Sequence, residues 1–156
     1  MSSHEIDSFE GMVEYFQQSD FEIVVDEQQQ AVEIPTHIGG QNTRTVLVWD
    51  PRGEVLRVIQ PLLETTPKTE DASVFEAIAR VNHVITLGAF GYDIIQGMVY
   101  FRWAVPRNNN RLTASQITAA VNTVLFSCRD FLPALGQVMR GELASAEVLS
   151  QVQMKT

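Results

Sequence analysis

The chain has 156 residues, of which 45% are hydrophobic and 19% are charged, a size and composition that predict one globular domain over residues 1–156. Its formal charge of −8 repels phosphate groups, so we expect neither nucleic acid nor an anionic membrane as a partner. Its single cysteine excludes an internal disulfide and a cysteine-based zinc site. No apolar stretch approaches the roughly 20 residues that cross a bilayer, and the N-terminus lacks the apolar run of a signal peptide, which together predict a cytoplasmic protein.

The N-terminal part is expected to form a helix followed by two short strands. Asp7 and Glu10 have the spacing of a capping box, and hydrophobic residues follow them at helical intervals. Alternating apolar and polar residues then indicate strands, and Pro35 is expected to end the second one because proline cannot donate to a β-ladder. The predicted elements are a helix at 8–18, a strand at 21–26, a turn at 27–30 and a strand at 31–34.

Two β-hairpins are predicted, one on each side of a central helix. The first turn, Asp50-Pro51-Arg52-Gly53, fits a type I turn, and the second lies at Gln96-Gly97. The strands that they join are 43–50 with 54–63, and 89–93 with 98–105. Because tight turns connect antiparallel neighbours, the expected fold class is α+β, with an antiparallel sheet of five or six strands flanked by three helices.

The central helix is marked by its charges and by an apolar stripe. Thr69 precedes Glu70 and Asp71, so a capping residue and negative charge lie at the positive end of the helix dipole. Apolar residues at helical spacing follow over residues 74–85.

The last helix begins at Thr113 and Gln116, again at the spacing of a capping box. Pro133 interrupts its apolar stripe and is expected to kink or split the helix, with Asp130 as a new cap. Gly141 either ends the helix or breaks it a second time. The expected ordered core is about 7–141, followed by a helix-prone segment at 142–149.

No group of residues has the pattern of a catalytic, cofactor or metal site. The histidines are scattered over separate segments, at His4, His37 and His83. Cys128 lies on the apolar stripe of the last helix, where an inert buried thiol is expected. The Gly88-x-x-Gly91 motif opens a hairpin, so no helix N-terminus is available to hold a dinucleotide phosphate. We therefore expect no enzymatic activity, no cofactor and no metal.

The strands are apolar on both faces, which is more than a simple core requires. In the strand at 98–105, Val99 and Phe101 alternate with Met98 and Tyr100, and either face could be the core face. A sheet that is apolar on both sides must be covered on both sides, by its own helices or by another chain. The candidate partner or dimer surface consists of Trp49, Ile59, Met98, Tyr100 and Arg102.

Several motifs of the second half follow one another in a fixed order. They are a helix with Asn82, the strand Leu87-Gly88-Ala89-Phe90-Gly91-Tyr92-Asp93, the strand Met98-Val99-Tyr100-Phe101-Arg102-Trp103-Ala104-Val105-Pro106, and Asp130-Phe131-Leu132-Pro133-Ala134-Leu135 before Gly141. The chain from about Phe9 to Gly141 resembles the YbjN family of bacterial proteins, within the type III secretion chaperone fold group. The resemblance implies a binding scaffold without a recognised active site, and a homodimer that uses the central helix and the strand from Met98 to Val105.

The function expected is protein binding, by a chaperone-like or regulatory adaptor that holds an extended peptide on its sheet or helix surface. The alternative is a small-ligand sensor or an undetected hydrolase, either of which needs a concave pocket with convergent polar groups. Exposed apolar grooves would favour the adaptor, whereas a closed, polar-lined cavity would favour the sensor or the hydrolase.

Overall fold

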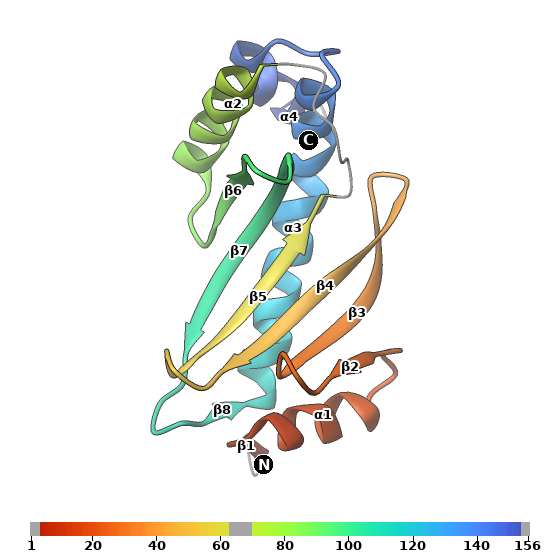
Figure 1. Cartoon of the computed structure of the whole chain (residues 1–156), viewed down its shortest axis with the longest axis vertical. Helices are drawn as coiled ribbons and strands as arrows, with labels where there is room; N and C mark the ends of the chain where they lie inside the picture. The colour runs from red at the N-terminus through yellow and green to blue at the C-terminus, as the bar shows by residue number, and fades with distance from the viewer. Residues whose placement is uncertain (1–3, 63–69, 154–156) are drawn as a thin grey trace.

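The computed structural model describes residues 4–62 and 70–153. In these ranges the strands are β1 (Glu5–Ile6), β2 (Val24–Asp26), β3 (Ala31–Ile38), β4 (Gln41–Asp50), β5 (Val55–Pro61), β6 (Ala89–Asp93), β7 (Met98–Pro106) and β8 (Leu112–Thr113). The helices are α1 (Phe9–Gln17), α2 (Asp71–Val84), α3 (Ala114–Met139) and α4 (Val148–Gln153), with a 3₁₀ turn at Ser145–Glu147. Six strands form an antiparallel sheet in the order β2-β3-β4-β5-β7-β6, which confirms the predicted α+β class (Figure 1).

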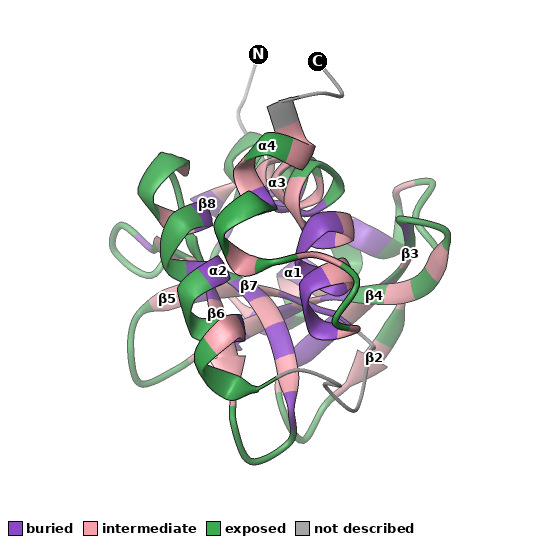
Figure 2. Ribbon diagram, turned by 90° about the horizontal axis from the view of Figure 1, so that it is seen from above, coloured by how far each residue is buried: buried purple, intermediate pink, exposed green. Residues whose placement is uncertain are grey.

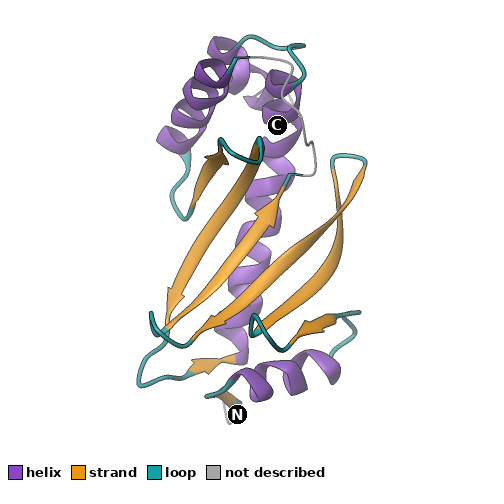
Figure 3. Cartoon of the chain, viewed as in Figure 1, coloured by secondary structure: helices purple, strands orange, loops and turns teal. Residues whose placement is uncertain are grey.

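The long helix α3 lies along one face of this sheet and forms the core with it. Figure 1 and Figure 3 show α3 passing behind the strands over most of their length. Alternate residues of the strands face the helix and are fully buried, among them Leu47, Val58 and Phe101. The apolar stripe of α3 supplies the other half of the core, at Ile117, Val121, Val124, Cys128, Leu132 and Leu135. The buried side chains form one continuous cluster.

Both predicted hairpins are present, and an aspartate fixes each turn. The Asp50 carboxylate accepts hydrogen bonds from the backbone amides of Arg52 (2.9 Å) and Gly53 (3.2 Å). At the second hairpin the Asp93 carboxylate accepts from the amides of Ile95 and Gln96 in the same way. In both cases the aspartate side chain replaces a backbone partner and so holds the turn closed.

The strand that contains Pro35 is longer than predicted. β3 continues through Pro35 to Ile38, so the expectation that proline ends it is wrong. The reason is the shortness of β2, which pairs only with Ala31–Glu33. Beyond Glu33, β3 is an edge strand among the described elements, and an edge tolerates a residue that lacks a donor.

The cap of α1 is also displaced from its predicted position. Ser8, not Asp7, caps the helix, and its hydroxyl accepts a hydrogen bond from the Gly11 amide at 3.1 Å. The helix lies against α3, where the Tyr15 hydroxyl meets the Thr118 hydroxyl at 2.7 Å.

The last helix is continuous, and its two ends are capped as the sequence indicates. The capping box is confirmed, because the Gln116 amide donates to the Thr113 hydroxyl and the Thr113 amide donates to the Gln116 side chain. At the other end Gly141, with φ +72°, ends the helix in a Schellman arrangement. The helix runs unbroken through Pro133, so the predicted split with a new cap at Asp130 is wrong. One missing hydrogen bond is outweighed by the apolar stripe that is buried on both sides of the proline.

Helix α2 closes the edge of the sheet at β6. The side-chain amide of Asn82 donates to the Phe90 carbonyl at 3.0 Å, and its oxygen accepts from the Phe90 amide at 2.8 Å. Asn82 thus satisfies both backbone groups that a further strand would have bonded. The start of this helix follows Glu70, while Thr69, the predicted cap, lies outside the described residues.

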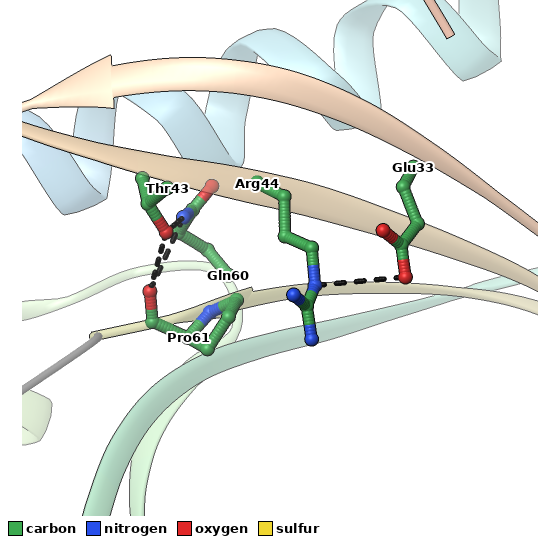
Figure 4. Close-up of polar contacts among 5 residues, drawn as sticks. All are labelled: Glu33, Thr43, Arg44, Gln60 and Pro61. Atoms are coloured by element: carbon green, nitrogen blue, oxygen red, sulfur yellow. Dashed lines mark hydrogen bonds and ion pairs between the residues drawn. The ribbon is translucent and has the colours of Figure 1, made fainter. Parts of the chain in front are cut away.

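A buried polar network sits inside the core near the ends of β4 and β5. Gln60 is fully buried, and its side chain accepts from the Thr45 hydroxyl at 2.6 Å. The same amide donates to the Thr43 hydroxyl at 3.0 Å and to the Pro61 carbonyl, as Figure 4 shows in part. Because every hydrogen-bonding atom of this amide has a partner, its burial carries no unsatisfied group.

The Asn82 contact can be tested by substitution. We expect Asn82→Ala to lower the free energy of unfolding by about 2 kcal/mol, since the Phe90 amide and carbonyl lose their partners together. Urea unfolding measures the difference. The control is Asn122→Ala on the exposed side of α3, which has the same effect on helix propensity without losing these bonds. Equal stabilities of the two variants would contradict the edge-closing role.

Candidate protein-binding surfaces

One face of the sheet points away from α3, and we call it the outer face. It is formed by alternate residues of the strands, including Glu33, Arg44, Val46, Val48, Arg57, Ile59, Tyr100, Arg102 and Ala104. All of these residues are half-buried or exposed. In Figure 1 this face is turned toward the viewer, and no helix of the described ranges lies over it.

Two ion pairs lie on the outer face. The Arg44 guanidinium is 3.5 Å from the Glu33 carboxylate, as Figure 4 shows, and the Arg57 guanidinium is 3.3 Å from Asp50. The backbone amides of the turn, foremost that of Arg52, lower the pKa of Asp50, and the charge of Arg57 acts in the same direction. These pairs are solvent-accessible, so they contribute little to stability and chiefly balance charge on the face.

Four of the five predicted surface residues lie on the outer face. Ile59 and Arg102 are direct cross-strand neighbours, with Tyr100 and Met98 further along β7. Trp49 lies instead on the core face, where it is 4% exposed. The guanidinium of Arg107 stacks over its ring at 4.3 Å and shields the indole from solvent. Trp49 therefore does not belong to the candidate surface.

The glycines of the Gly88-x-x-Gly91 motif permit close packing at β6. A Cβ at Gly91 would lie 2.5 Å from the ring of Tyr100, which therefore rests on bare backbone. Gly88 has φ +73°, and a Cβ there would strike the Phe101 ring. Gly88 thus supplies the backbone freedom that the entrance of β6 requires.

A second candidate surface lies where the C-terminal end of α2 meets the middle of α3. We call it the α2–α3 groove. It has a volume of ≈ 250 Å³ and is lined by Val84, Ile85, Thr86, Leu87, Thr123, Ser127 and Phe131. Val84 and Leu87 are 50% and 49% exposed, and Phe126, one helical turn from Thr123, is 56% exposed. Figure 2 shows α2 with its largely exposed surface beside α3.

Sequence reasoning did not find this groove. Val84 continues the apolar stripe of α2 in register, seven residues after the buried Ala77, so helical spacing alone predicts a buried side chain where the structure leaves it 50% exposed. That the end of this stripe lies beside Thr123 and Ser127 of α3 depends on the tertiary structure.

The described residues offer little for catalysis. They contain no cluster of three or more His, Cys, Asp or Glu residues that could hold a metal. Cys128 is buried, and burial raises the pKa of its thiol. A cavity of ≈ 120 Å³ lies between the β3–β4 hairpin and α3, with Thr43 and Leu132 in its wall. It is smaller than the roughly 300–1,000 Å³ typical of small-molecule sites. Hollows of ≈ 530 Å³ beside Asn108 and ≈ 420 Å³ beside Phe9 reach that size, but they are more open to solvent.

The largest pKa shift with a specific partner belongs to Tyr92, at the edge where α2 meets β6. Burial of the phenol, followed by its hydrogen bond of 2.7 Å to the Asp71 carboxylate, raises the pKa of Tyr92 to about 12. Its ring also packs edge-on against Phe75, with ring centroids 5.3 Å apart. The shift therefore arises from contacts that fasten α2 to the sheet and not from a group of convergent polar side chains.

This shift predicts a loss of stability at high pH. Above about pH 10 the unfolded chain releases the Tyr92 proton, whereas the folded chain retains it until about pH 12. The free energy of unfolding should therefore fall as the pH rises through this range and be unaffected below it. Urea unfolding as a function of pH measures the fall, which Tyr92→Phe should reduce. Tyr15→Phe is the control and should keep it, so an equal profile for both variants would contradict the assignment.

Comparison with known proteins identifies the family. None of the helices within 4–62 and 70–153 has the length and hydrophobicity needed to span a membrane. No curated protein matches the sequence significantly. A family profile does match it over residues 8–137, that of YbjN, described as "Putative bacterial sensory transduction regulator". The match includes α1, the whole sheet, α2 and nearly all of α3, and it confirms the predicted family. The chain therefore belongs to the YbjN family.

Proposed function

We propose that this protein is a chaperone-like regulatory adaptor of the bacterial cytoplasm, which binds a polypeptide segment in the α2–α3 groove and catalyses no reaction. The observation that carries the proposal is the exposure of two large apolar side chains, Val84 and Leu87, that line one groove. Apolar side chains gathered around a groove mark interaction sites more often than single exposed residues do. The description of the family as a regulator of sensory transduction supports the regulatory part.

The groove fits a short apolar segment in an extended conformation. Thr123 and Phe131, at its two ends along α3, are separated by roughly 12 Å of helix. That length accommodates about four residues of an extended strand. Burying the exposed half of the Leu87 side chain under such a segment contributes about 1 kcal/mol. The hydroxyls of Thr86, Thr123 and Ser127 supply hydrogen-bonding groups for the backbone of the bound segment.

The experiment compares groove variants in affinity capture from the native cell, followed by binding measurements with the purified partner. Leu87→Asp and Val84→Asp place a charge where an apolar anchor should be buried, so each should weaken binding by about a hundredfold. The matched control is Ile95→Asp, because Ile95 is 93% exposed at the tip of the β6–β7 hairpin, away from the groove residues. The affinity of the Ile95→Asp variant for the partner should equal that of the unmodified chain.

Two results would contradict the proposal. One is a captured protein that binds all three variants equally. The other is the absence of any enriched protein while a small metabolite raises the melting temperature, which would favour the ligand-sensor function instead. Circular dichroism and thermal unfolding of each variant establish that lost binding does not reflect lost folding.

A further inference from the structure

We infer that the outer face is covered by a second copy of this chain, in a dimer whose two sheets stack face to face about a two-fold axis. The axis runs parallel to the strands, over the line between β4 and β5. This surface is separate from the α2–α3 groove, so the inference goes beyond the proposed function and does not depend on it.

The argument starts from one row of side chains that crosses the whole sheet on its outer face. The register places Val46 beside Ile59, Ile59 beside Arg102, and Glu33 beside Val46. The complete row, one residue from each strand, is Val24, Glu33, Val46, Ile59, Arg102 and Ala89. Its centre is apolar, with a carboxylate on one side and a guanidinium at the same distance on the other.

Such a row is complementary to itself when it is rotated by 180°. The strand order β2-β3-β4-β5-β7-β6 has its midpoint between β4 and β5, so the rotation lays β3 of one copy over β7 of the other and β4 over β5. Glu33 then meets Arg102 of the other copy, and Val46 meets Ile59 of the other copy. Because the axis is parallel to the strands, residues keep their positions along the strands, and this pairing occurs twice in the dimer.

The neighbouring rows agree with the same axis. One row contains Ala31, Val48, Arg57 and Ala104; Ala31 is already buried in its own chain, and the rotation sets Val48 against Arg57 of the other copy. In the row on the other side of Glu33, Pro35 comes to face Tyr100 of the other copy. In none of these three rows do two like charges meet across the axis.

Charge distribution favours a second copy at this face over the rest of the molecule. Two chains of formal charge −8 repel each other over most of their surfaces. On the outer face, by contrast, the carboxylates of Glu33 and Asp50 are already paired with arginines. Arg102 is exposed there and contributes a further positive charge. Repulsion between copies is therefore reduced at this face.

The size of the face places such a dimer at the lower limit of stable interfaces. Six strands about 4.8 Å apart span roughly 24 Å, and the seven residues of β5 span roughly 20 Å in the other direction. Both copies together would bury on the order of 1,000 Å², close to the lower end of stable interfaces at about 1,200 Å². Stacked sheets pack with their strands nearly aligned, at about −30°, a displacement that the long Glu33 and Arg102 side chains can follow.

The test exchanges the two charges in separate chains. Glu33→Arg sets two arginines against each other in its homodimer, and Arg102→Glu sets two glutamates against each other. Each single variant should be monomeric by sedimentation velocity at concentrations where the unmodified chain is a dimer, with the dissociation constant raised by about a hundredfold. An equimolar mixture of the two variants should dimerise again, because positions 33 and 102 then carry two arginines in one chain and two glutamates in the other. Every contact between these positions across the axis then joins opposite charges.

Recovery on mixing distinguishes a lost contact between chains from a folding defect. A variant that had failed to fold would not regain the ability to dimerise when it is mixed with the other variant. Arg52→Glu, in the exposed turn after β4, is the matched charge control and should remain dimeric. A monomeric unmodified chain at high micromolar concentration would overturn the inference. So would a dimer that both single variants retain, or a mixture of the variants that stays monomeric. None of these outcomes bears on capture of a polypeptide by the α2–α3 groove.

Discussion

The structure depends on a single packing constraint, the burial of one long helix against alternate residues of an antiparallel sheet. The apolar stripe of α3 is long enough to reach from the β8 end of the molecule to the Schellman turn at Gly141. Because side chains alternate across a strand, this contact assigns every residue of the sheet to one of two faces. It buries Leu47 and Phe101, and it leaves Val46 and Tyr100 on the opposite side. The existence of an outer face is thus a direct consequence of where α3 lies.

The two edges of the sheet are blocked in different ways, which directs contacts with other molecules to faces and grooves. At one edge, the Asn82 side chain bonds both backbone groups of Phe90. At the other, Pro35 removes a donor from the part of β3 that β2 does not cover. Both devices discourage the addition of a further strand, a ready route to aggregation for an antiparallel sheet. The outer face, with its apolar centre and charged flanks, and the α2–α3 groove remain accessible.

Local signals in the sequence were sufficient for most of the fold. The turn at Asp50, the capping box at Thr113 and the C-terminal Gly141 each depend on neighbouring residues, and the structure confirms all three. The expected strand end at Pro35 and the expected split at Pro133 are wrong for a common reason, because the tolerance of a proline depends on what lies beside it in space. Strand alternation alone could not show which face α3 covers, so Trp49 was placed on the wrong side. The groove could not be predicted from the sequence either, since its walls come from segments about 40 residues apart.

The contact between Asn82 and Phe90 has a further consequence for molecular recognition. The two residues are eight positions apart, and their paired hydrogen bonds close the intervening chain into a small ring. Val84, Ile85, Thr86 and Leu87, one wall of the α2–α3 groove, all lie within that ring. A loop fastened at both ends has little conformational freedom left to lose when a ligand settles on it. The same side-chain amide that finishes the sheet therefore preorganises the wall beside it, and a partner could be held there at a low entropic cost.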